Sequence, residues 1–280
     1  RSVTAIGDQI TNGRNMWTGP SLPGASVPIL GIPVGSYLLV AQAMVDGKPY
    51  RGTQTADIRP EGPSEIAIPV EAGVDLMGSL SVEGPGAEKY FGGSVSLVPG
   101  DGLPWNRPPL RASVNKDGSF KIAGVPAGVW DINASPLPSG GYIKSMKLGD
   151  QDVLTEAMEI RADTTASLKI VMGTQAAILE GTVIGGDQPA RAFVVLAPEE
   201  KFREVLSFYR FAVSDDKGHV EIKGVMPGRY RIYAFEEFEQ RSIQDPDFLK
   251  PYESAGVAVN LREGQNEAQK LSVIPAGVSK

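Results

Sequence analysis

Gly124-Val-Pro-Ala-Gly-Val-Trp130 is the stretch that decides the fold, and its pattern occurs twice more in the chain. The other copies are Gly31-Ile-Pro-Val-Gly-Ser-Tyr37 and Gly224-Val-Met-Pro-Gly-Arg-Tyr230. Their leading glycines are separated by 93 and 100 residues. A period of that length is typical of repeated domains, because the units of solenoids are only about 20–45 residues long. The sequence therefore predicts about three copies of one small domain.

Each copy of the motif is predicted to be a tight turn between two β-strands. Before the middle copy, Phe120 and Ile122 alternate with polar residues, which is the period of a strand. Gly124 can take positive φ and Pro126 is unsuited to a central strand, while Gly128 permits a second bend. Alternating aliphatic residues then resume, so the sequence predicts an all-β fold.

An aromatic residue closes each copy, namely Tyr37, Trp130 or Tyr230. We interpret these three as structural anchors beside the turn, because an amphipathic ring suits a half-buried position. A ligand contact is the alternative. Residues on one face of a strand recur at period two, which predicts a mostly buried set: Phe120, Ile122, Trp130, Ile132, Val220, Ile222, Tyr230 and Ile232.

The longer pattern, from Asp117-Gly-Ser-Phe-Lys-Ile122 to Trp130, resembles the carboxypeptidase regulatory-like family. This resemblance implies tandem transthyretin-like (prealbumin-like, Ig-like) seven-stranded β-sandwiches, and it says almost nothing about activity. The expected domains are residues 1–72, 73–173 and 174–280. The first copy departs from the pattern, since Gly24-Ala25 replaces Asp-Gly and Pro28 falls within the strand. A bulge or an edge position is expected there.

Hydrophobic alternation and turn residues predict most of the other strands. Asp46-Gly47 is a strong hairpin signal. Short helical turns are expected near 198–206 and 245–251, where prolines suit early helical positions. The remaining predicted strands cover residues 2–6, 37–44, 50–58, 65–70, 76–82, 93–98, 111–114, 142–148, 166–172, 178–184, 192–196, 255–261 and 270–274.

Composition excludes several classes of partner and chemistry. A net charge of −6 and a pI near 5.0 argue against nucleic acid and against an anionic membrane surface. No apolar run is long enough to span a bilayer, so no membrane insertion by this segment is expected. The absence of cysteine excludes disulfides, cysteine–zinc sites and thiol nucleophiles.

The residues also give little support for catalysis, so the chain is predicted not to be an enzyme and to hold no metal or cofactor. The single histidine, His219, replaces a serine in the motif strand and is expected at the surface. Carboxylate clusters could serve calcium or a glycosidase pair, but their spacing favours turn acids and a helix cap. These clusters are Asp215-Asp216, Asp245 with Asp247, and Glu236-Glu237 with Glu239.

Related pilin-type prealbumin-like domains carry a lysine–asparagine isopeptide bond between an early strand and the last strand. Here the predicted early strands 76–82 and 178–184 contain no lysine. The predicted last strands 166–172 and 270–274 contain no asparagine. The second and third repeats are therefore expected to lack this crosslink.

Trp17 and Trp105 are the candidate ligand-binding residues, because they are expected in matching loops among Gly, Pro and Asn. Exposed loop aromatics stack on sugar rings in many sandwich modules. The alternative is that each tryptophan folds over the end of its sandwich as a plug.

The first repeat is predicted to be incomplete. Leu76 and Ala176, near the first strands of the other repeats, each lie 48 residues before the motif glycine. Counting back 48 from Gly31 passes the start of the chain, so this repeat should begin at its second strand. We expect Arg1 to be a boundary inside a longer protein, and the vacant strand position to be solvated or filled by a neighbouring molecule's strand.

The leading functional hypothesis is a non-catalytic, extracytoplasmic scaffold of carboxypeptidase regulatory-like domains within a larger bacterial protein. It would be periplasmic, on the outer surface or secreted, with a protein or glycan partner. The alternative is a carbohydrate- or peptide-binding module that uses the loop aromatics.

Overall fold

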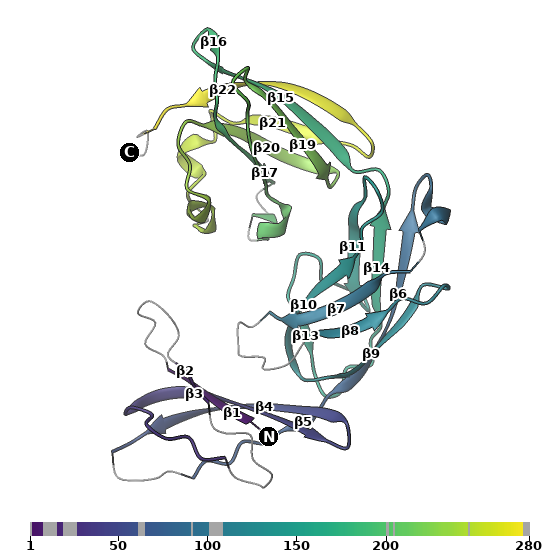
Figure 1. Ribbon diagram of the computed structural model, residues 1–280, viewed down its shortest axis with the longest axis vertical. Coiled ribbons are helices and arrows are strands. Elements are labelled where there is room, and N and C mark those ends of the chain that lie inside the picture. The colour runs from purple at the N-terminus through teal and green to yellow at the C-terminus, as the bar shows by residue number, and fades with distance from the viewer. Residues whose placement is uncertain are drawn as a thin grey trace. The chain divides into compact units, whose positions relative to one another are not determined.

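The computed structural model describes residues 2–7, 16–18, 27–60, 65–90, 92–100, 109–199, 202–203, 205–245 and 247–276, with the backbone alone described up to residue 18. The predicted all-β class is confirmed, since strands dominate and the helices are short 3-10 turns (Figure 1). Two of these helical turns, near residues 206 and 250, were predicted from the sequence, whereas those near residues 88 and 242 were not. They are η1 (Ala87–Lys89), η3 (Leu206–Phe208), η4 (Gln240–Gln244) and η5 (Lys250–Tyr252).

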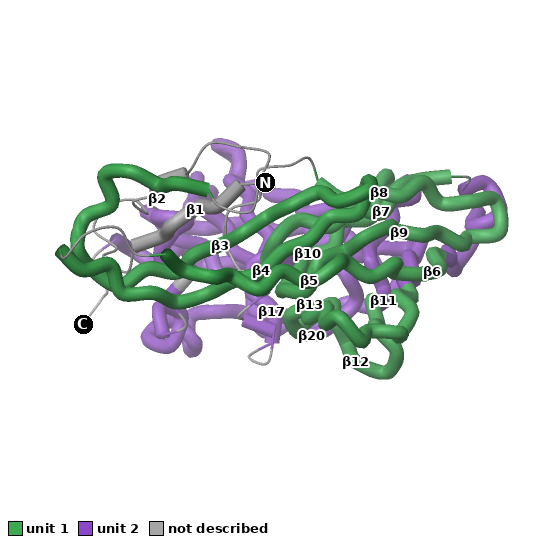
Figure 2. The backbone as a smooth tube through the Cα atoms, turned by 90° about the horizontal axis from the view of Figure 1, so that it is seen from below, with its two compact units in different colours: residues 1–80, 92–136, 146–169 green, residues 81–91, 137–145, 170–280 purple. Residues whose placement is uncertain are grey.

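The chain forms two compact units (Figure 2). The first comprises residues 1–80, 92–136 and 146–169, and the second comprises residues 81–91, 137–145 and 170–280. These units do not follow the predicted domain boundaries at 72 and 173, so the division into three domains stays a prediction. The strands are described below as those of a first (1–72), a middle (73–173) and a third (174–280) segment.

The first segment contributes a single five-stranded sheet in the order β2-β1-β3-β4-β5. Asp46 and Gly47 both have positive φ and close the long β3–β4 hairpin at the predicted turn. No second sheet of a sandwich occurs among the described residues of this segment. The strands are β1 (Ser2–Gly7), β2 (Met16–Thr18), β3 (Gly35–Val45), β4 (Lys48–Ile58) and β5 (Glu71–Ala72).

The strand predicted at 65–70 is wrong, because these residues cover the sheet instead of pairing with it. Ile66 and Ile68 pack against the small cluster of Tyr37 and Leu39. A Cβ on Gly52 would collide with the carbonyl oxygen of Pro69, so this crossing depends on a glycine in β4. Residues 27–30, where a bulged or edge strand was expected, are also irregular.

The middle segment forms two sheets, β13-β10-β7-β8 and β12-β11-β14-β6-β9. Buried apolar residues come from both sheets and include Leu76, Leu97, Phe120, Trp130 and Leu168. The strands are β6 (Val74–Glu83), β7 (Ser94–Pro99), β8 (Leu110–Ser113), β9 (Ser119–Val125), β10 (Gly128–Ser135), β11 (Tyr142–Leu148), β12 (Gln151–Asp152), β13 (Met158–Ile160) and β14 (Leu168–Gly173).

The third segment forms one eight-stranded sheet system, β16-β15-β22-β20-β17-β18, with β19 paired to β15 and β21 paired to β20. The short parallel pairing of Ala234 with Val273 and Phe235 with Ile274 joins its two halves. The strands are β15 (Ala177–Gly185), β16 (Gln188–Pro189), β17 (Phe193–Pro198), β18 (Arg210–Val213), β19 (His219–Val225), β20 (Gly228–Phe235), β21 (Val257–Leu261) and β22 (Asn266–Ile274).

The strands that follow the three motif turns share one pairing register. In the middle and third segments the two strands flanking the turn do not pair with each other, because β9 pairs with β6 and β19 with β15. Each motif aromatic faces the last residue of the preceding paired strand on one side and a short apolar residue or methionine on the other. In the first segment β1 takes the position of β7 and β17, as expected of a second strand. The facing residues are Gly7 and Ala56 for Tyr37, Pro99 and Met158 for Trp130, and Pro198 and Val259 for Tyr230.

The motif turn itself is also repeated in detail. The leading glycines, Gly31, Gly124 and Gly224, have φ values of 72°, 63° and 68°, a region that other residues rarely adopt. Each aromatic side chain then donates a hydrogen bond to a carbonyl four residues before it. The distances are 2.9 Å from Tyr37 to Pro33, 2.9 Å from Trp130 to Pro126 and 2.8 Å from Tyr230 to Met226.

The predicted burial of the motif strands is confirmed. Trp130 is only 1% exposed, and Ile132 is the one member of the predicted set that is half-buried. The anchoring role of Tyr37, Trp130 and Tyr230 stays a prediction, because burial does not measure how much each ring stabilises its segment.

The sequence alignment that placed Ala176 opposite Leu76, 48 residues before each motif glycine, is wrong by three residues. Pairing shows that Leu76 faces Ile122 on β9 and that Leu179 faces Ile222 on β19. Leu179, and not Ala176, is therefore the counterpart of Leu76. Among the described residues of the first segment, no strand pairs in the manner of β6 and β15.

Candidate functional site

The candidate site lies on the third segment, where a second apolar cluster covers the outer face of β17 and β20. Tyr233 and Phe235 alternate with the inward-facing Ile232 and Ala234, so β20 is buried on both faces. We call this second group the outer cluster. Its buried members are Val195, Ala197, Tyr209, Tyr233, Phe235, Ile243, Leu249, Tyr252 and Ile274, with Phe238 and Phe248 packed against them.

The insertion between β20 and β21, residues 236–256, is fixed at both ends. At its start, Glu236 N–H donates to the Ile274 carbonyl, and the Glu236 carboxylate accepts from Ala276 N–H at 3.0 Å. At its end, the Arg231 guanidinium donates to the carbonyl oxygens of Glu253 and Gly256 at 2.8 and 3.0 Å. The insertion therefore forms a bound cover over the sheet and carries most of the pocket-lining residues.

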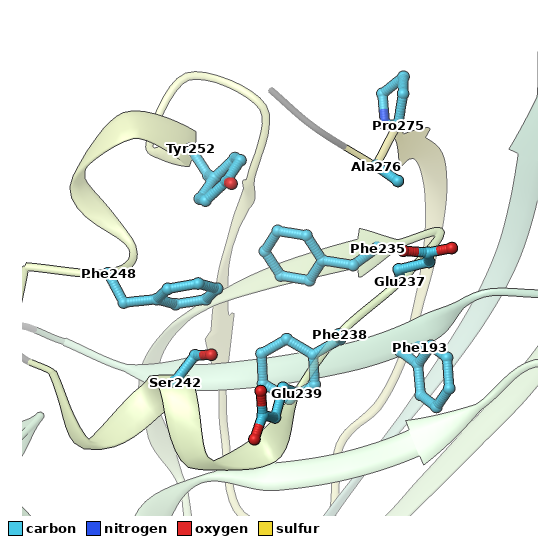
Figure 3. A pocket seen from close by; sticks show the side chains of 10 residues that line it. All are labelled: Phe193, Phe235, Glu237, Phe238, Glu239, Ser242, Phe248, Tyr252, Pro275 and Ala276. Atoms are coloured by element: carbon cyan, nitrogen blue, oxygen red, sulfur yellow. The ribbon is translucent and has the colours of Figure 1, made fainter. Parts of the chain in front are cut away.

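A pocket of about 470 Å³ opens on this cover (Figure 3). Phe193 begins β17 and Phe235 ends β20, so strand ends supply one wall of the pocket. The insertion supplies the rest of the aromatic lining and two acids. The lining residues are Phe193, Phe235, Glu237, Phe238, Glu239, Ser242, Phe248, Tyr252, Pro275 and Ala276.

Phe235 lies at the centre of the aromatic group. Its ring is stacked on Phe238 at 5.5 Å and meets Tyr252 edge-on at 5.1 Å between ring centroids. Phe248 completes the group, at 5.9 Å from Phe238 and 5.7 Å from Tyr252. Such ring pairs contribute beyond the apolar area they bury, so they hold the pocket wall in a defined shape.

A second pocket of about 450 Å³ lies beside the first and shares Glu239 with it. Its other lining residues are Leu206, Phe211, Gln240, Arg241 and Ile243. Phe211 is stacked on Phe238 at 5.9 Å, so the aromatic row continues between the two pockets. Leu206 and Phe211 remain partly exposed, which leaves apolar surface along this row.

The outer cluster buries two tyrosine hydroxyl groups among apolar side chains and has acidic residues at its exposed edge. Burial raises the pKa of the Tyr233 and Tyr209 phenols, so both are neutral at physiological pH. The half-buried side chain of Arg203 forms an ion pair with Glu253 at 3.1 Å. Glu237 and Glu239 are exposed at the mouth of the first pocket.

A polar group also connects elements within the second compact unit. Tyr142 in β11 donates to Glu263 at 2.7 Å, and Lys144 pairs with both Glu83 and Glu263 at 3.0 Å. Burial, followed by the bond to Glu263, holds the pKa of Tyr142 well above its usual range. Hydrogen bonds from Tyr142 and Lys144 lower the pKa of Glu263. We call these four residues the junction.

The two tryptophans predicted to bind a ligand are not among the residues that line the two pockets. Trp105 lies outside the described residues. Trp17 lies in the short strand β2, where a loop was expected, and faces Ala5, but its side chain is outside the described residues. Both therefore stay candidates on the sequence alone.

The carboxylate clusters act as backbone acceptors in turns. The Asp215 carboxylate accepts from the N–H groups of Lys217 and His219 at 2.9 and 2.8 Å, and Asp245 accepts from Asp247 N–H at 3.0 Å. His219 is exposed on β19 and does not line either pocket. Within the described ranges, no three histidine or acidic side chains come together as a metal site.

The predicted absence of an asparagine from the last strand of the third segment is wrong. β22 begins earlier than expected and includes Asn266, whose amide donates to Glu180 at 3.1 Å. Strand β15, which pairs with it, contains no lysine. In the part of the chain that the structure describes, no helix has the length and apolar character needed to cross a bilayer.

The aromatic pocket was not predicted from the sequence, although the sequence carries a compositional signal for it. Seven of the nine phenylalanines fall between residues 193 and 248, and Phe235-Glu-Glu-Phe-Glu239 places aromatic and acidic residues side by side after a strand. At the corresponding position the middle segment has Ser135-Pro136. That contrast was visible without any structure.

No protein-family model matches the chain, and no curated protein matches its sequence. Among solved structures, the chain is similar to the Bacillus anthracis TIE protein, with 12% identity, a TM-score of 0.24 and coverage of 98% of this chain and 47% of that one. It is also similar to a streptococcal ancillary pilin, with 10% identity, a TM-score of 0.30 and coverage of 97% and 92%.

The third similarity is to GBS52, the minor pilin of Streptococcus agalactiae, with 12% identity, a TM-score of 0.29 and coverage of 72% of this chain and 95% of that one. The chain thus spans about half the length of the TIE protein. Because these TM-scores are low, the function proposed below rests on contacts within this chain.

Proposed function

We propose that this chain is a non-catalytic scaffold of linked β-sandwiches that works outside the cytoplasm and presents surfaces to a protein or glycan partner. The carboxypeptidase regulatory-like identity, the three-domain division at 72 and 173 and the extracytoplasmic location belong to this proposal. They rest on the resemblance of the motif strands, whose turn geometry recurs three times.

The junction is the observation that supports a scaffold best. Lys144 is held by two carboxylates, and Tyr142 bonds to one of them. Nearby backbone bonds, from Ala176 to Gly140 and from Gly264 to Gln175, are both 2.8 Å long. A segment boundary with this many polar contacts resists bending, which suits a spacer that holds binding surfaces at fixed separation.

Small-angle scattering of the full chain tests this role. The double variant Tyr142→Phe/Lys144→Met should broaden the distribution of interatomic distances relative to the unaltered chain. Lys121→Met is the matched control, since it removes one exposed ion pair, with Asp75 at 2.7 Å, away from the junction. An unaltered chain that already scatters as freely jointed beads would contradict the proposal, as would turnover in a hydrolase screen.

Binding through Trp17 and Trp105 remains the alternative function. A glycan array probed with the full chain and with Trp105→Ala tests it. Binding that disappears in the variant would favour the carbohydrate-binding module over the plain scaffold.

A further inference from the structure

The first pocket offers aromatic surface that the outer cluster does not fully bury. Phe193 is 41% exposed, and Phe238 and Phe248 are half-buried, whereas Phe235 and Tyr252 form the floor. The volume of about 470 Å³ falls within the range of about 300–1,000 Å³ found for small-ligand sites. Ring faces and edges are therefore accessible to a ligand.

The charge at the mouth of this pocket has one sign. Of the ten described lining residues, Glu237 and Glu239 are acidic and none is basic. The nearby Lys250 is engaged with Asp247 at 2.7 Å, and Arg241 lines the neighbouring pocket. Between residues 236 and 247 the sequence has five acids and one arginine, so the local potential is negative.

Aromatic faces and carboxylates attract the same class of ligand. A ring carries negative charge on its face, and cations held over several rings are stabilised most when water is excluded. A metal ion needs several oxygen ligands, whereas half of the lining residues are aromatic and only two are acidic. A sugar could stack a C–H face on these rings, but it carries no positive charge to pair with the two carboxylates. An anion would meet two carboxylates.

We infer that the pocket binds an alkylammonium cation. The charged nitrogen lies at the rim near Glu237 and Glu239, and its methyl or methylene groups contact Phe193, Phe238 and Phe248. Two sources present this chemistry, namely a lysine side chain on a partner peptide and a free quaternary ammonium such as choline. This binding site rests on the proposed scaffold function, because it would be one of the surfaces that the scaffold presents to a partner. The two proposals can fail separately, since binding is tested with variants of the pocket and the scaffold with variants of the junction.

Ligand-observed NMR titration of the full chain tests the site with choline, an acetylated lysine-containing pentapeptide whose lysine side chain is free, and 3,3-dimethylbutan-1-ol, the neutral isostere of choline. We expect binding of choline, of the peptide or of both, with the N-methyl or ε-methylene protons shifted upfield by ring currents. We expect the neutral isostere to bind at least about fivefold more weakly. Whichever cation binds identifies the source.

Variants locate the binding. Phe238→Ala and the volume-keeping Phe238→Leu should each weaken binding by about tenfold, and Glu239→Gln by about three- to tenfold with a loss of salt dependence. Asp187→Asn, an exposed acid in the β15–β16 turn, controls for net charge and should change nothing. Equal binding of the neutral isostere, no binding of either cation, or unchanged binding by Phe238→Leu and Glu239→Gln would each overturn the inference.

Discussion

Strands β10 and β20 follow the same motif, share a pairing register and each present an aromatic residue, an isoleucine and an alanine inward, but their outward-facing residues differ. On β10 the outward residues Asp131, Asn133 and Ser135 are exposed. On β20 the equivalent positions are Arg231, Tyr233 and Phe235, and the last two are buried in the outer cluster. The strand after one and the same motif turn can therefore support either a solvated face or a second core, and the outward positions decide which.

The segment after each strand accounts for the difference. After β10 the chain forms β11, whose alternating sequence lets it pair between β12 and β14 in the second sheet. After β20 the chain instead forms the helical turns η4 and η5, and Pro251 within η5 has no N–H to donate to a strand ladder. β22 then pairs directly with the end of β20. In the described part of the third segment no strand corresponds to β11, and the insertion that supplies most of the pocket-lining residues stands at that point of the chain.

The largest expected loss of stability is at Trp130, which occupies in β10 the position that Tyr230 occupies in β20. Trp130→Ala should lower the free energy of unfolding by roughly 3–5 kcal/mol, because it removes a fully buried ring and its bond to Pro126. Urea unfolding followed by circular dichroism measures this. A loss below about 1 kcal/mol would refute the anchor interpretation.

The outward positions should respond unequally. Phe235→Ala should destabilise the protein by about 3 kcal/mol, since the ring is the centre of the outer cluster. Ser135→Ala, the equivalent change on the exposed face of β10, should cost less than about 0.5 kcal/mol. Equal costs in parallel chemical denaturation would show that the two faces do not differ energetically.

Removing only the hydroxyl of Tyr230 should have a smaller effect. Tyr230→Phe should cost about 1 kcal/mol, because the Met226 carbonyl loses its bond while the ring packing stays. Tyr37→Phe provides the matched change in the first segment. Burial also raises the pKa of Tyr230 to about 12, so ultraviolet titration should show this phenol ionising after the exposed ones.

The junction should make stability depend modestly on pH at both extremes. The pKa of Glu263 is lowered on folding, so its contribution is present above about pH 4.3 and is lost as pH falls through the folded value. The pKa of Tyr142 is raised, so its contribution is complete below about pH 10 and is lost at higher pH.

Thermal unfolding midpoints measured from pH 3 to pH 11 check this dependence. Glu263→Gln should flatten the acidic limb and Tyr142→Phe the alkaline limb, while the exposed-residue control Glu88→Gln should change neither. Unaltered limbs in both junction variants would show that other groups set the pH dependence.

The repeated motif turn and the strands beside it could be predicted from the sequence alone. The glycine turn, the alternating strands and the closing aromatic are local features, and glycine conformation and period-two burial are imposed by the backbone wherever they occur. The predicted burial of Phe120, Ile122 and Trp130 was therefore correct.

Only the tertiary structure decided which segments pair and which cover a sheet. Residues 65–70 have strand periodicity, but they pack their isoleucines on a sheet face because Gly52 allows a close crossing. The pocket likewise depends on Phe193, Phe235 and Tyr252, which are far apart in sequence and meet only when the insertion folds onto β17 and β20. Long-range packing of this kind leaves no fixed spacing along the chain, so no local pattern could have specified it.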